Sequence, residues 1–342
     1  MIILAIETSC DETCAAVVTL LRQGFGRASV KILSNVVYSQ IDLHKEFGGV
    51  VPNIAKRAHE EKIEFVIKKA LGKEIVDAIA VTAGPGLAIA LEVGIRHAKE
   101  WASKLDKPLI AVNHIEGHVL SGLTPEVKFP AMALVVSGKH TDLIWVEKIG
   151  QYEIVARTMD DALGEALDKA ARMLGLGYPG GAELEKRAAL GDSKKYPLPL
   201  PMARSKELAF SYSGLKTAMW RLVNSLSLSE QTINDLAAAF QNRAFQHLLR
   251  ITKLVMEKYP TQDLLVGGGV AANAKLREEI KRLSYEAGGN AWFPGKGMYG
   301  DNAAMIGIVA GFKAERGEFA DPNKIDRLPR WRVDENAFVP HP

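Results

Sequence analysis

The stretch MIILAIETSCDETCAAVVTLL, residues 1–21, sets the fold that we expect for this chain. Residues 1–7 form an apolar run that predicts a strand, and residues 14–21, rich in Ala and Val, predict a second strand. The segment between them, residues 8–13, holds three hydroxyl side chains and two acids. The pattern is typical of a hairpin whose polar tip either suits a phosphate or a metal-bound group or is simply a solvated turn.

The same pattern recurs near the start of the second half. Residues 129–136 predict a strand, residues 137–142 form a polar turn, and residues 143–149 predict a return strand. One hairpin with a polar tip in each half indicates a duplicated, two-lobed protein with a ligand between two loops. The 342 residues are enough for two domains.

Strand, glycine turn and helix also follow one another at two further places. Residues 75–82 form a β-branched run, residues 84–86 are Gly-Pro-Gly, and a helix is expected to about residue 105. Residues 264–266 predict another strand, which three glycines and a helix follow. This order is that of an α/β fold with a ligand near a helix N-terminus, where glycine lets the backbone approach a ligand closely.

Composition narrows the class of protein. The chain is 47% hydrophobic and 24% charged, as in ordinary globular proteins. A net charge of +3 is too small to identify a nucleic-acid binder and does not exclude one. Cys10 and Cys14 make no disulfide framework, so we expect packing residues in a reducing compartment. No basic leader opens the sequence and no apolar run approaches the roughly 20 residues of a membrane span, so a cytoplasmic protein is expected.

The stretch His114-Ile115-Glu116-Gly117-His118 is the candidate metal motif. Two imidazoles four residues apart lie on one face of a helix and can grip one ion, although two unrelated histidines would show the same spacing. A zinc protease of the H-E-x-x-H type needs Glu directly after the first His, whereas Glu116 falls on the opposite face. A third ligand must come from elsewhere. Asp301 opens the last expected helix, where its plain role would be an N-cap.

Ten short motifs then occur in the order that one family shows. They are ETSCDET (7–13), GGVVP (48–52), GPGL (84–87), HIEGH (114–118), VSGKHT (136–141), GEALDK (164–169), LGLGYPGG (174–181), SYSGLKT (211–217), GGVAAN (268–273) and GDNAAM (300–305). On these motifs the chain resembles the tRNA N6-adenosine threonylcarbamoyltransferases, the TsaD family, over nearly its whole length. The VSG segment resembles the bacterial or organellar branch.

The resemblance implies the fold of actin, Hsp70 and the sugar kinases, the ASKHA fold: an α/β protein of two lobes, each on a five-stranded mixed sheet, with a nucleotide in the cleft. The expected N-terminal lobe comprises residues 1–113 and a C-terminal helix over about 303–325. The expected C-terminal lobe, residues 114–302, carries the metal and nucleotide loops.

The resemblance also implies the site residues. The metal ligands map onto His114, His118 and Asp301, and the ion is Fe²⁺ by family, with Zn²⁺ or Mg²⁺ as alternatives. The segments that bind the adenylate-type ligand map onto Val135, Val136, Ser137, Gly138, Lys139, Asp168, Gly181, Glu185 and Asn273. Lys139 stands where the family usually has Gly, and it either adds a phosphate contact or crowds the nucleotide.

The implied reaction moves the threonylcarbamoyl group from threonylcarbamoyl-AMP to N6 of the adenosine 3′ of the anticodon in tRNAs that read ANN codons, the t6A modification. Asp11 or Glu12 is our hypothetical base for the amine proton. The implied partners are tRNA, a paralogous protein of the same fold and a small ATPase. Basic side chains that could contact tRNA phosphates, or that are ordinary solvated surface, are Lys194, Lys195, Arg204, Lys206, Lys216 and Arg221.

Three other functions stay open on the sequence. One is an ATP-dependent phosphotransferase of the same fold, which the phosphate loops also fit. The second is a metalloprotease, which the position of Glu116 weakens. The third is a non-catalytic subunit of a tRNA-modification complex.

Overall fold

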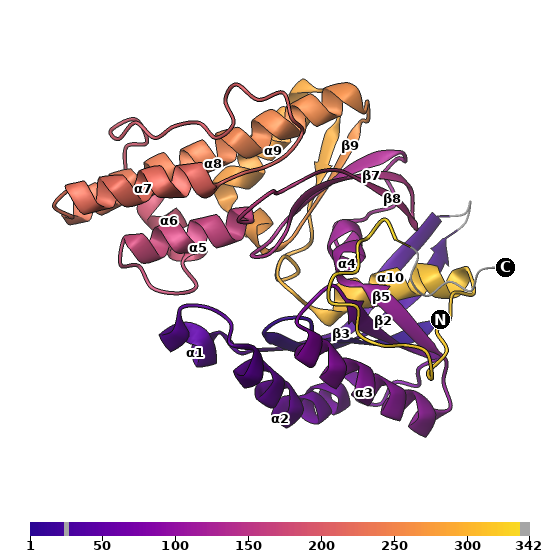
Figure 1. Ribbon diagram of the computed structural model, residues 1–342. Coiled ribbons are helices and arrows are strands. Elements are labelled where there is room, and N and C mark those ends of the chain that lie inside the picture. The colour runs from indigo at the N-terminus through magenta and orange to yellow at the C-terminus, as the bar shows by residue number, and fades with distance from the viewer. Residues whose placement is uncertain (24–26, 336–342) are drawn as a thin grey trace. The chain divides into compact units, whose positions relative to one another are not determined.

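The computed structural model describes residues 1–23 and 27–335, and the chain divides into two compact units (Figure 1). The first unit comprises residues 1–127 and 149–152 and the chain from Pro294 onward, and the second comprises residues 128–148 and 153–293. Each unit is built on one five-stranded mixed sheet, which confirms the expected fold class.

The first sheet has the strand order β3-β2-β1-β4-β5. Its N-terminal hairpin is antiparallel, with Glu7 opposite Cys14, and β1 pairs in parallel with β4, which pairs in parallel with β5. Strands β4 and β5 are buried along their whole length, as parallel strands covered on both faces must be. The strands are β1 (Ile2–Glu7), β2 (Glu12–Gln23), β3 (Arg27–Ser39), β4 (Ala78–Gly84) and β5 (Leu109–Asn113).

Helices cover both faces of the first sheet. Side chains of β1 and β2 alternate between the faces, so Leu4 and Val17 join the core under α2 and α3, whereas Val18 meets α10 on the other face. Figure 1 shows α2 and α3 side by side. The helices of this unit are α1 (Ile41–His44), α2 (Pro52–Leu71), α3 (Ala88–Leu105), α4 (His114–Leu120) and α10 (Ala303–Glu315), with a 3₁₀ turn at Lys45–Phe47.

The last helix is shorter than the expected 303–325. Helix α10 ends at Glu315, and Gly317 takes a positive φ of 72°, which breaks the helical path. The chain then returns to the sheet, where Ala320 bridges Leu109 and the backbone N–H of Leu328 donates to the carbonyl of Ala83 at 2.7 Å. Helix α10 therefore ends near Arg316, as the residues after Asn302 predict by themselves, and the sequence after residue 315 pairs with the sheet instead of extending the helix.

The second sheet has the strand order β10-β9-β6-β7-β8. The expected second hairpin is present, since β6 pairs antiparallel with β7, while β9 runs parallel to β6. The strands are β6 (Ala131–Val136), β7 (Thr141–Lys148), β8 (Gln151–Arg157), β9 (Asp263–Gly267) and β10 (Asn290–Trp292). The helices are α5 (Leu163–Met173), α6 (Gly181–Ala188), α7 (Ser213–Ser225), α8 (Glu230–Lys258) and α9 (Ala274–Glu286), with a 3₁₀ turn at Gly269–Ala272.

Two boundaries differ from the sequence-based ones. The sequence of about residues 229–259 predicts two helices. The structure has the single helix α8 of 29 residues there, whose sequence contains neither Gly nor Pro to interrupt it. The division of the chain falls after Val127 and before Pro294, whereas the lobes were expected to meet at residues 113/114 and 302/303. Helix α4 stays with the first sheet because it follows β5 directly and packs on α10.

Candidate metal centre and nucleotide loops

The two histidines of the candidate metal motif project from the start of α4. The side chain of Asn113, the last residue of β5, accepts hydrogen bonds from the backbone N–H groups of Ile115 and Glu116 at 2.9 and 3.3 Å, and so begins the helix at His114. One helical turn later His118 follows on the same face, with the ring centroids 4.7 Å apart. Both rings are buried, which removes them from competing water.

Asp301 joins the two rings from the far end of the sequence. Its Oδ1 lies 3.1 Å from Nε2 of His118 and 3.5 Å from Nε2 of His114, and the three ligand atoms lie within 4.8 Å of one another. The cap of α10 is the next residue, since Asn302 Oδ1 accepts from the Met305 N–H at 3.1 Å. The N-cap alternative for Asp301 is therefore wrong, and its carboxylate faces the imidazoles. Two neutral imidazoles and a carboxylate form a donor set that fits a first-row divalent cation.

Glu7 is a site residue that the sequence analysis missed. It is fully buried at the end of β1, and its Oε2 lies 3.0 Å from Nδ1 of His114, with Ser9 Oγ 3.1 Å from the same nitrogen. Thr82 Oγ1 donates to Oε2 at 2.6 Å, and the Ser9 N–H donates to Oε1. Burial alone would raise the pKa of Glu7, but the His114 ring outweighs burial and lowers it.

The Glu7 contact determines which nitrogen of His114 can bind a cation. An ionised carboxylate accepts the Nδ1–H proton and leaves the Nε2 lone pair on the side of Asp301, the usual arrangement of a carboxylate behind a metal-bound histidine. A lone acid at the end of an otherwise apolar strand was the only sequence signal for this role.

The polar tip after β1 also lies beside the three candidate metal ligands, His114, His118 and Asp301. Asp11 is buried, and burial together with the carboxylates of Asp301 and Asp11 raises the pKa of Glu12 well above its usual range. Cys14 Sγ lies 3.7 Å from the Asp301 carbonyl oxygen, and burial raises the pKa of its thiol. Neither Cys10 nor Cys14 forms a disulfide, as the sequence analysis expects.

Glu116 points away from the histidines. Tyr152 donates from its hydroxyl to Glu116 Oε1 at 2.9 Å, and burial raises the pKa of this carboxyl. A protease of the H-E-x-x-H type needs its glutamate at the metal-bound water. The geometry of Glu116 therefore argues against that mechanism, as the sequence spacing predicted.

The first candidate nucleotide loop follows β6 in the second unit. The side chains of Val135 and Val136 are fully buried, so only their backbone can face a ligand. Ser137 shapes the turn, because its Oγ accepts from the His140 N–H at 3.0 Å and its own N–H donates to the His140 carbonyl at 2.8 Å. Gly138 and Lys139 are exposed at the tip.

The other candidate adenylate-binding residues lie in the same unit, where hydrogen bonds connect them in two groups. Asp168 Oδ1 accepts from the N–H groups of Gly180 and Gly181 at 2.8 and 2.9 Å, and burial raises the pKa of this carboxyl. Glu185 Oε1 accepts from the Ala274 N–H at 2.8 Å, directly after Asn273, whose side chain caps α9. The structure thus brings Asp168 to Gly181 and Glu185 to the start of α9.

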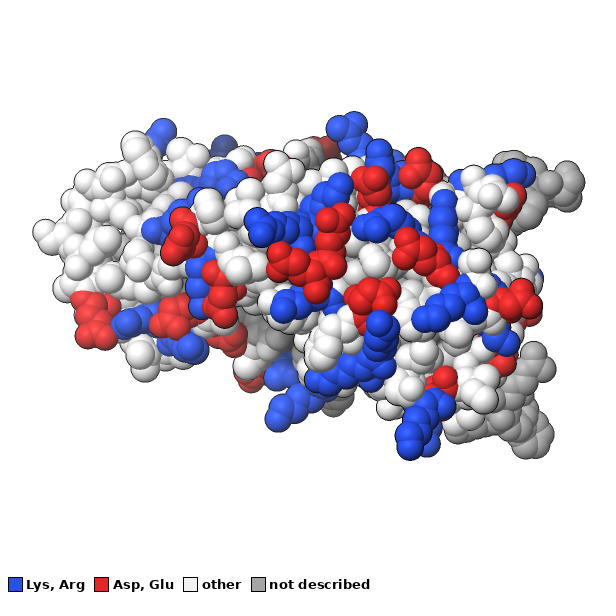
Figure 2. All heavy atoms as spheres, turned by 90° about the horizontal axis from the view of Figure 1, so that it is seen from below, with Lys and Arg blue, Asp and Glu red and all other residues white. Residues whose placement is uncertain are grey.

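The basic residues proposed for tRNA contact differ in their surroundings. Lys216 lies 2.6 Å from Asp161 Oδ2, which balances its charge. The other five, Lys194, Lys195, Arg204, Lys206 and Arg221, are exposed. On the face drawn in Figure 2, basic and acidic side chains alternate, so that face shows no broad basic surface.

The two mixed sheets with their helices define a protein of the ASKHA class. Among solved structures, full-length HypF in its phosphate- and nucleotide-bound form superposes with a TM-score of 0.58 at 14% identity, covering 92% of this chain and 56% of that one. The activator of the 2-hydroxyisocaproyl-CoA dehydratase from Clostridium difficile with bound ADPNP gives 0.52 at 15% identity, covering 93% and 97%. At these identities the likeness shows the fold alone.

The family is narrower than the fold. The family model of tRNA N6-adenosine threonylcarbamoyltransferase, TsaD, matches residues 31–308, and this chain belongs to that family. Its relatives of that name include proteins of Pelagibacter ubique (43% identical; 98% of this chain and 96% of the relative), Chelativorans sp. (46%; 98% and 96%) and Thermosipho africanus (43%; 97% and 100%).

Membership makes the chain a transferase that acts in t6A modification of tRNA, as the resemblance predicted. Among the described residues no helix is both long enough and apolar enough to cross a membrane.

Proposed function

We propose that this chain transfers the threonylcarbamoyl group of threonylcarbamoyl-AMP to N6 of the adenosine 3′ of the anticodon in tRNAs that read ANN codons, and that the reaction needs a divalent cation. The observation that carries the proposal is the convergence of His114 Nε2, His118 Nε2 and Asp301 Oδ1 in a buried site. A bound cation would polarise donor oxygens and balance the charge that develops on them. Fe²⁺ is the expected ion, with Zn²⁺ or Mg²⁺ as alternatives.

The loops of the second unit are the proposed adenylate site. Because the Ser137 N–H already donates within the turn, Gly138 is the better backbone donor for a phosphate oxygen. A Cβ at Gly138 would meet no atom within 4 Å, so the side of the Cα where a side chain would stand is open. The other proposed adenylate contacts are Asp168, Gly181, Glu185 and Asn273.

In the proposed reaction the lone pair of adenosine N6 forms a bond to the carbamoyl carbon, the bond between that carbon and the AMP phosphate oxygen breaks, and AMP leaves. Asp11 or Glu12 takes the N6 proton. Adenine N6 is a weak nucleophile, so most of the acceleration must come from holding the two reactants in place, an effect worth on the order of 7–11 kcal/mol in well-oriented reactions.

Other macromolecules complete the proposal. The exposed basic residues Lys194, Lys195, Arg204, Lys206 and Arg221 are the proposed phosphate contacts of tRNA. A protein of the same fold and a small ATPase are the proposed partners, in the cytoplasm.

The test is reconstitution with unmodified tRNA and synthetic threonylcarbamoyl-AMP, with and without chelator and partner proteins. We expect a modified nucleoside by mass spectrometry, lost with chelator and with Asp301→Ala, and retained with Asp326→Ala, which removes an exposed acid of the same unit. Full activity after His114→Ala would contradict the metal role and favour a non-catalytic subunit. Sugar phosphorylation by ATP without tRNA modification would favour the phosphotransferase.

A further inference from the structure

A second set of metal-ligand side chains lies in the first unit, on the paired helices α2 and α3. Glu64 comes from α2, and His97 and Glu100 come from α3. The Nδ1 of His97 lies 3.2 Å from Glu64 Oε1 and 3.5 Å from Glu100 Oε2, and one ligand atom of each residue lies within 4.8 Å of the others. The ligand atoms of His114, His118 and Asp301 lie within the same limit of one another.

The helix geometry explains the convergence. His97 and Glu100 are three residues apart and therefore neighbours on one face of α3. Helix α2 packs against α3, and Val66 and Val93 of the two helices belong to the same hydrophobic core, so Glu64 lies opposite His97. The His97 residue is only 8% exposed, while the side chains of Glu64 and Glu100 are 44% and 55% exposed, so the ring is fixed and water can reach the carboxylates.

The ring nitrogen Nδ1 of His97 faces more carboxylate oxygens than it can bond with one proton. Two carboxylate oxygens face one ring nitrogen, and a single N–H proton can make only one good hydrogen bond. A cation in place of the ring proton would contact the nitrogen and both carboxylate oxygens at once.

Glu64 is held ready as an ionised ligand. The Trp101 indole N–H donates to Glu64 Oε1 at 3.0 Å, and Lys68 Nζ lies 3.3 Å from Oε2. Burial opposes ionisation, but the hydrogen bonds from Trp101, Lys68 and His97 outweigh it and lower the pKa of this carboxyl. An indole donor behind a carboxylate resembles the outer contacts that orient metal ligands.

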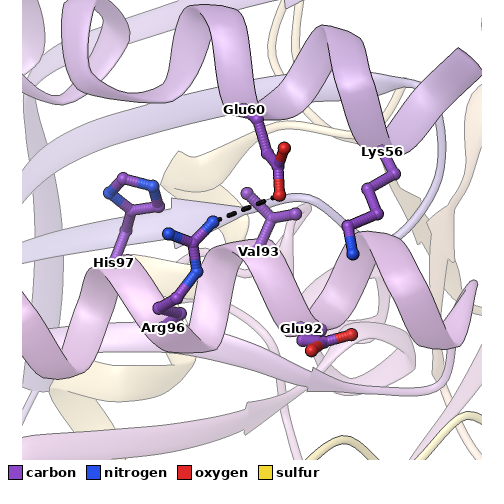
Figure 3. Close-up of a pocket in the computed structure, with 6 residues that line it drawn as sticks. All are labelled: Lys56, Glu60, Glu92, Val93, Arg96 and His97. Atoms are coloured by element: carbon purple, nitrogen blue, oxygen red, sulfur yellow. Dashed lines mark hydrogen bonds and ion pairs between the residues drawn. The ribbon is translucent and has the colours of Figure 1, made fainter.

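A pocket lined by residues of α2 and α3 reaches His97. Its volume is about 370 Å³, room for several waters, and His97 lies at one end of it (Figure 3). Arg96 reaches across it to Glu60 at 3.3 Å, so the nearest guanidinium is already paired. Water from this pocket can fill the positions that three protein ligands leave open on a four-coordinate ion.

We propose that Glu64, His97 and Glu100 form a second divalent cation site, of the kind that takes Zn²⁺, which joins α2 to α3. One imidazole with two carboxylates is a donor set used by zinc. This site shares no residue with the candidate catalytic metal site of His114, His118 and Asp301, so neither proposal depends on the other.

The test counts cations bound to the full-length chain after chelation and dialysis against Zn²⁺, with Co²⁺ absorption as a report of coordination. We expect two equivalents in the unaltered chain, one in the His114→Ala/His118→Ala variant, and none when His97→Gln is added. Glu100→Gln in the His114→Ala/His118→Ala background should weaken binding at least tenfold. Glu92→Gln is the matched control, because Glu92 also lies on α3 but is not one of the three proposed ligands. It should leave the count of bound cations unchanged.

A thermal shift separates binding from a folding defect. Zn²⁺ should raise the unfolding temperature of the His114→Ala/His118→Ala variant, but not of the triple variant with His97→Gln, while both keep the same circular dichroism spectrum. A single equivalent in the unaltered chain that disappears with His114→Ala/His118→Ala would overturn the second site. The same two-equivalent count without any tRNA modification would instead contradict the proposed function alone.

Discussion

The buried contact between Glu7 and His114 orients one of the two imidazoles, and its removal should be felt in cation affinity. Glu7→Gln keeps the shape of the side chain but loses the negative charge that stabilises the Nδ1–H tautomer. We expect the affinity for the catalytic cation to fall about 10- to 100-fold, as for other residues behind metal-bound histidines. Competition with a chromophoric chelator measures it.

The control for Glu7→Gln is a second buried carboxyl of the same unit. Glu116 faces Tyr152 and not the cation ligands, so Glu116→Gln should leave the affinity unchanged. Equal losses in both variants would mean that the effect is general loosening of α4.

The buried ring of His247 predicts a dependence of stability on pH. Burial, aided by Arg250, lowers the pKa of His247 to about 4, while the unfolded chain titrates near 6.5. Between these values the unfolded state binds more protons, so the free energy of unfolding must fall as the pH falls from about 6.5 to 4.

Comparison with His247→Gln isolates this contribution. The amide oxygen of glutamine can replace Nε2 as acceptor for the Ser211 N–H, which lies 3.2 Å away. The stability of the unaltered chain relative to the variant should decline by up to about 3 kcal/mol over that window, as urea unfolding at several pH values would measure. A difference independent of pH would show that His247 has the same pKa in the folded and the unfolded state.

At the scale of elements, the turn after β9 runs so close to the end of β6 that only glycine fits at one position. Gly268, after β9, has a φ of 95°, and a Cβ there would lie 2.3 Å from the carbonyl oxygen of Val136 at the end of β6. Gly268→Ala should therefore cost about 1–3 kcal/mol in the free energy of unfolding through steric strain. Urea unfolding gives the value.

The next residue provides the control for this glycine. A Cβ at Gly269 would meet nothing within 4 Å, and its φ is not positive, so Gly269→Ala should change stability little. If both variants lose the same free energy, the contact with Val136 is not responsible for the loss.

Sequence periodicity predicted which elements exist better than where they end. Both hairpins, the helices after the glycine turns and the helix at His114 are present because each follows from local apolar patterns. The expectation of two helices over residues 229–259 was wrong, since no breaking residue interrupts α8. Contacts of residues 316–328 with the sheet decide the path of the chain after α10. The same holds for the candidate site. The pairing of His114 and His118 could be predicted because they are neighbours in the sequence, whereas the role of Glu7, which is far from His114 in the sequence, was missed.

At the scale of the whole chain, the segment after α10 completes the first unit. Trp331 is buried in the core of the first sheet, its carbonyl accepts from Asn113 Nδ2 at 3.2 Å, and its indole donates to the Glu335 carbonyl at 2.9 Å. Trp331→Ala should lower the free energy of unfolding by about 3–5 kcal/mol. Trp220, which is 56% exposed, is the control, and Trp220→Ala should have a small effect.

Three exposed basic side chains of the proposed tRNA surface predict how the affinity for tRNA depends on salt concentration. If Lys194, Lys195 and Arg204 contact phosphates, replacing all three by Ala should reduce the slope of log affinity against log salt by about 2 to 3. The exposed residues Lys31, Lys73 and Lys253 allow a control of equal charge change. Equal slopes in the two triple variants would remove the first set from the tRNA surface.

The sequence by itself determined the two-sheet α/β architecture, the pair of histidines on one helical face and the family, because periodicity, spacing and ordered motifs are local properties. Only the tertiary structure decided that Asp301, 183 residues after His118, lies within 3.1 Å of it, and that Glu7 holds His114 from behind. Such contacts depend on how β1, α4 and α10 pack around one sheet, and no local pattern encodes a distance between residues so far apart in the chain.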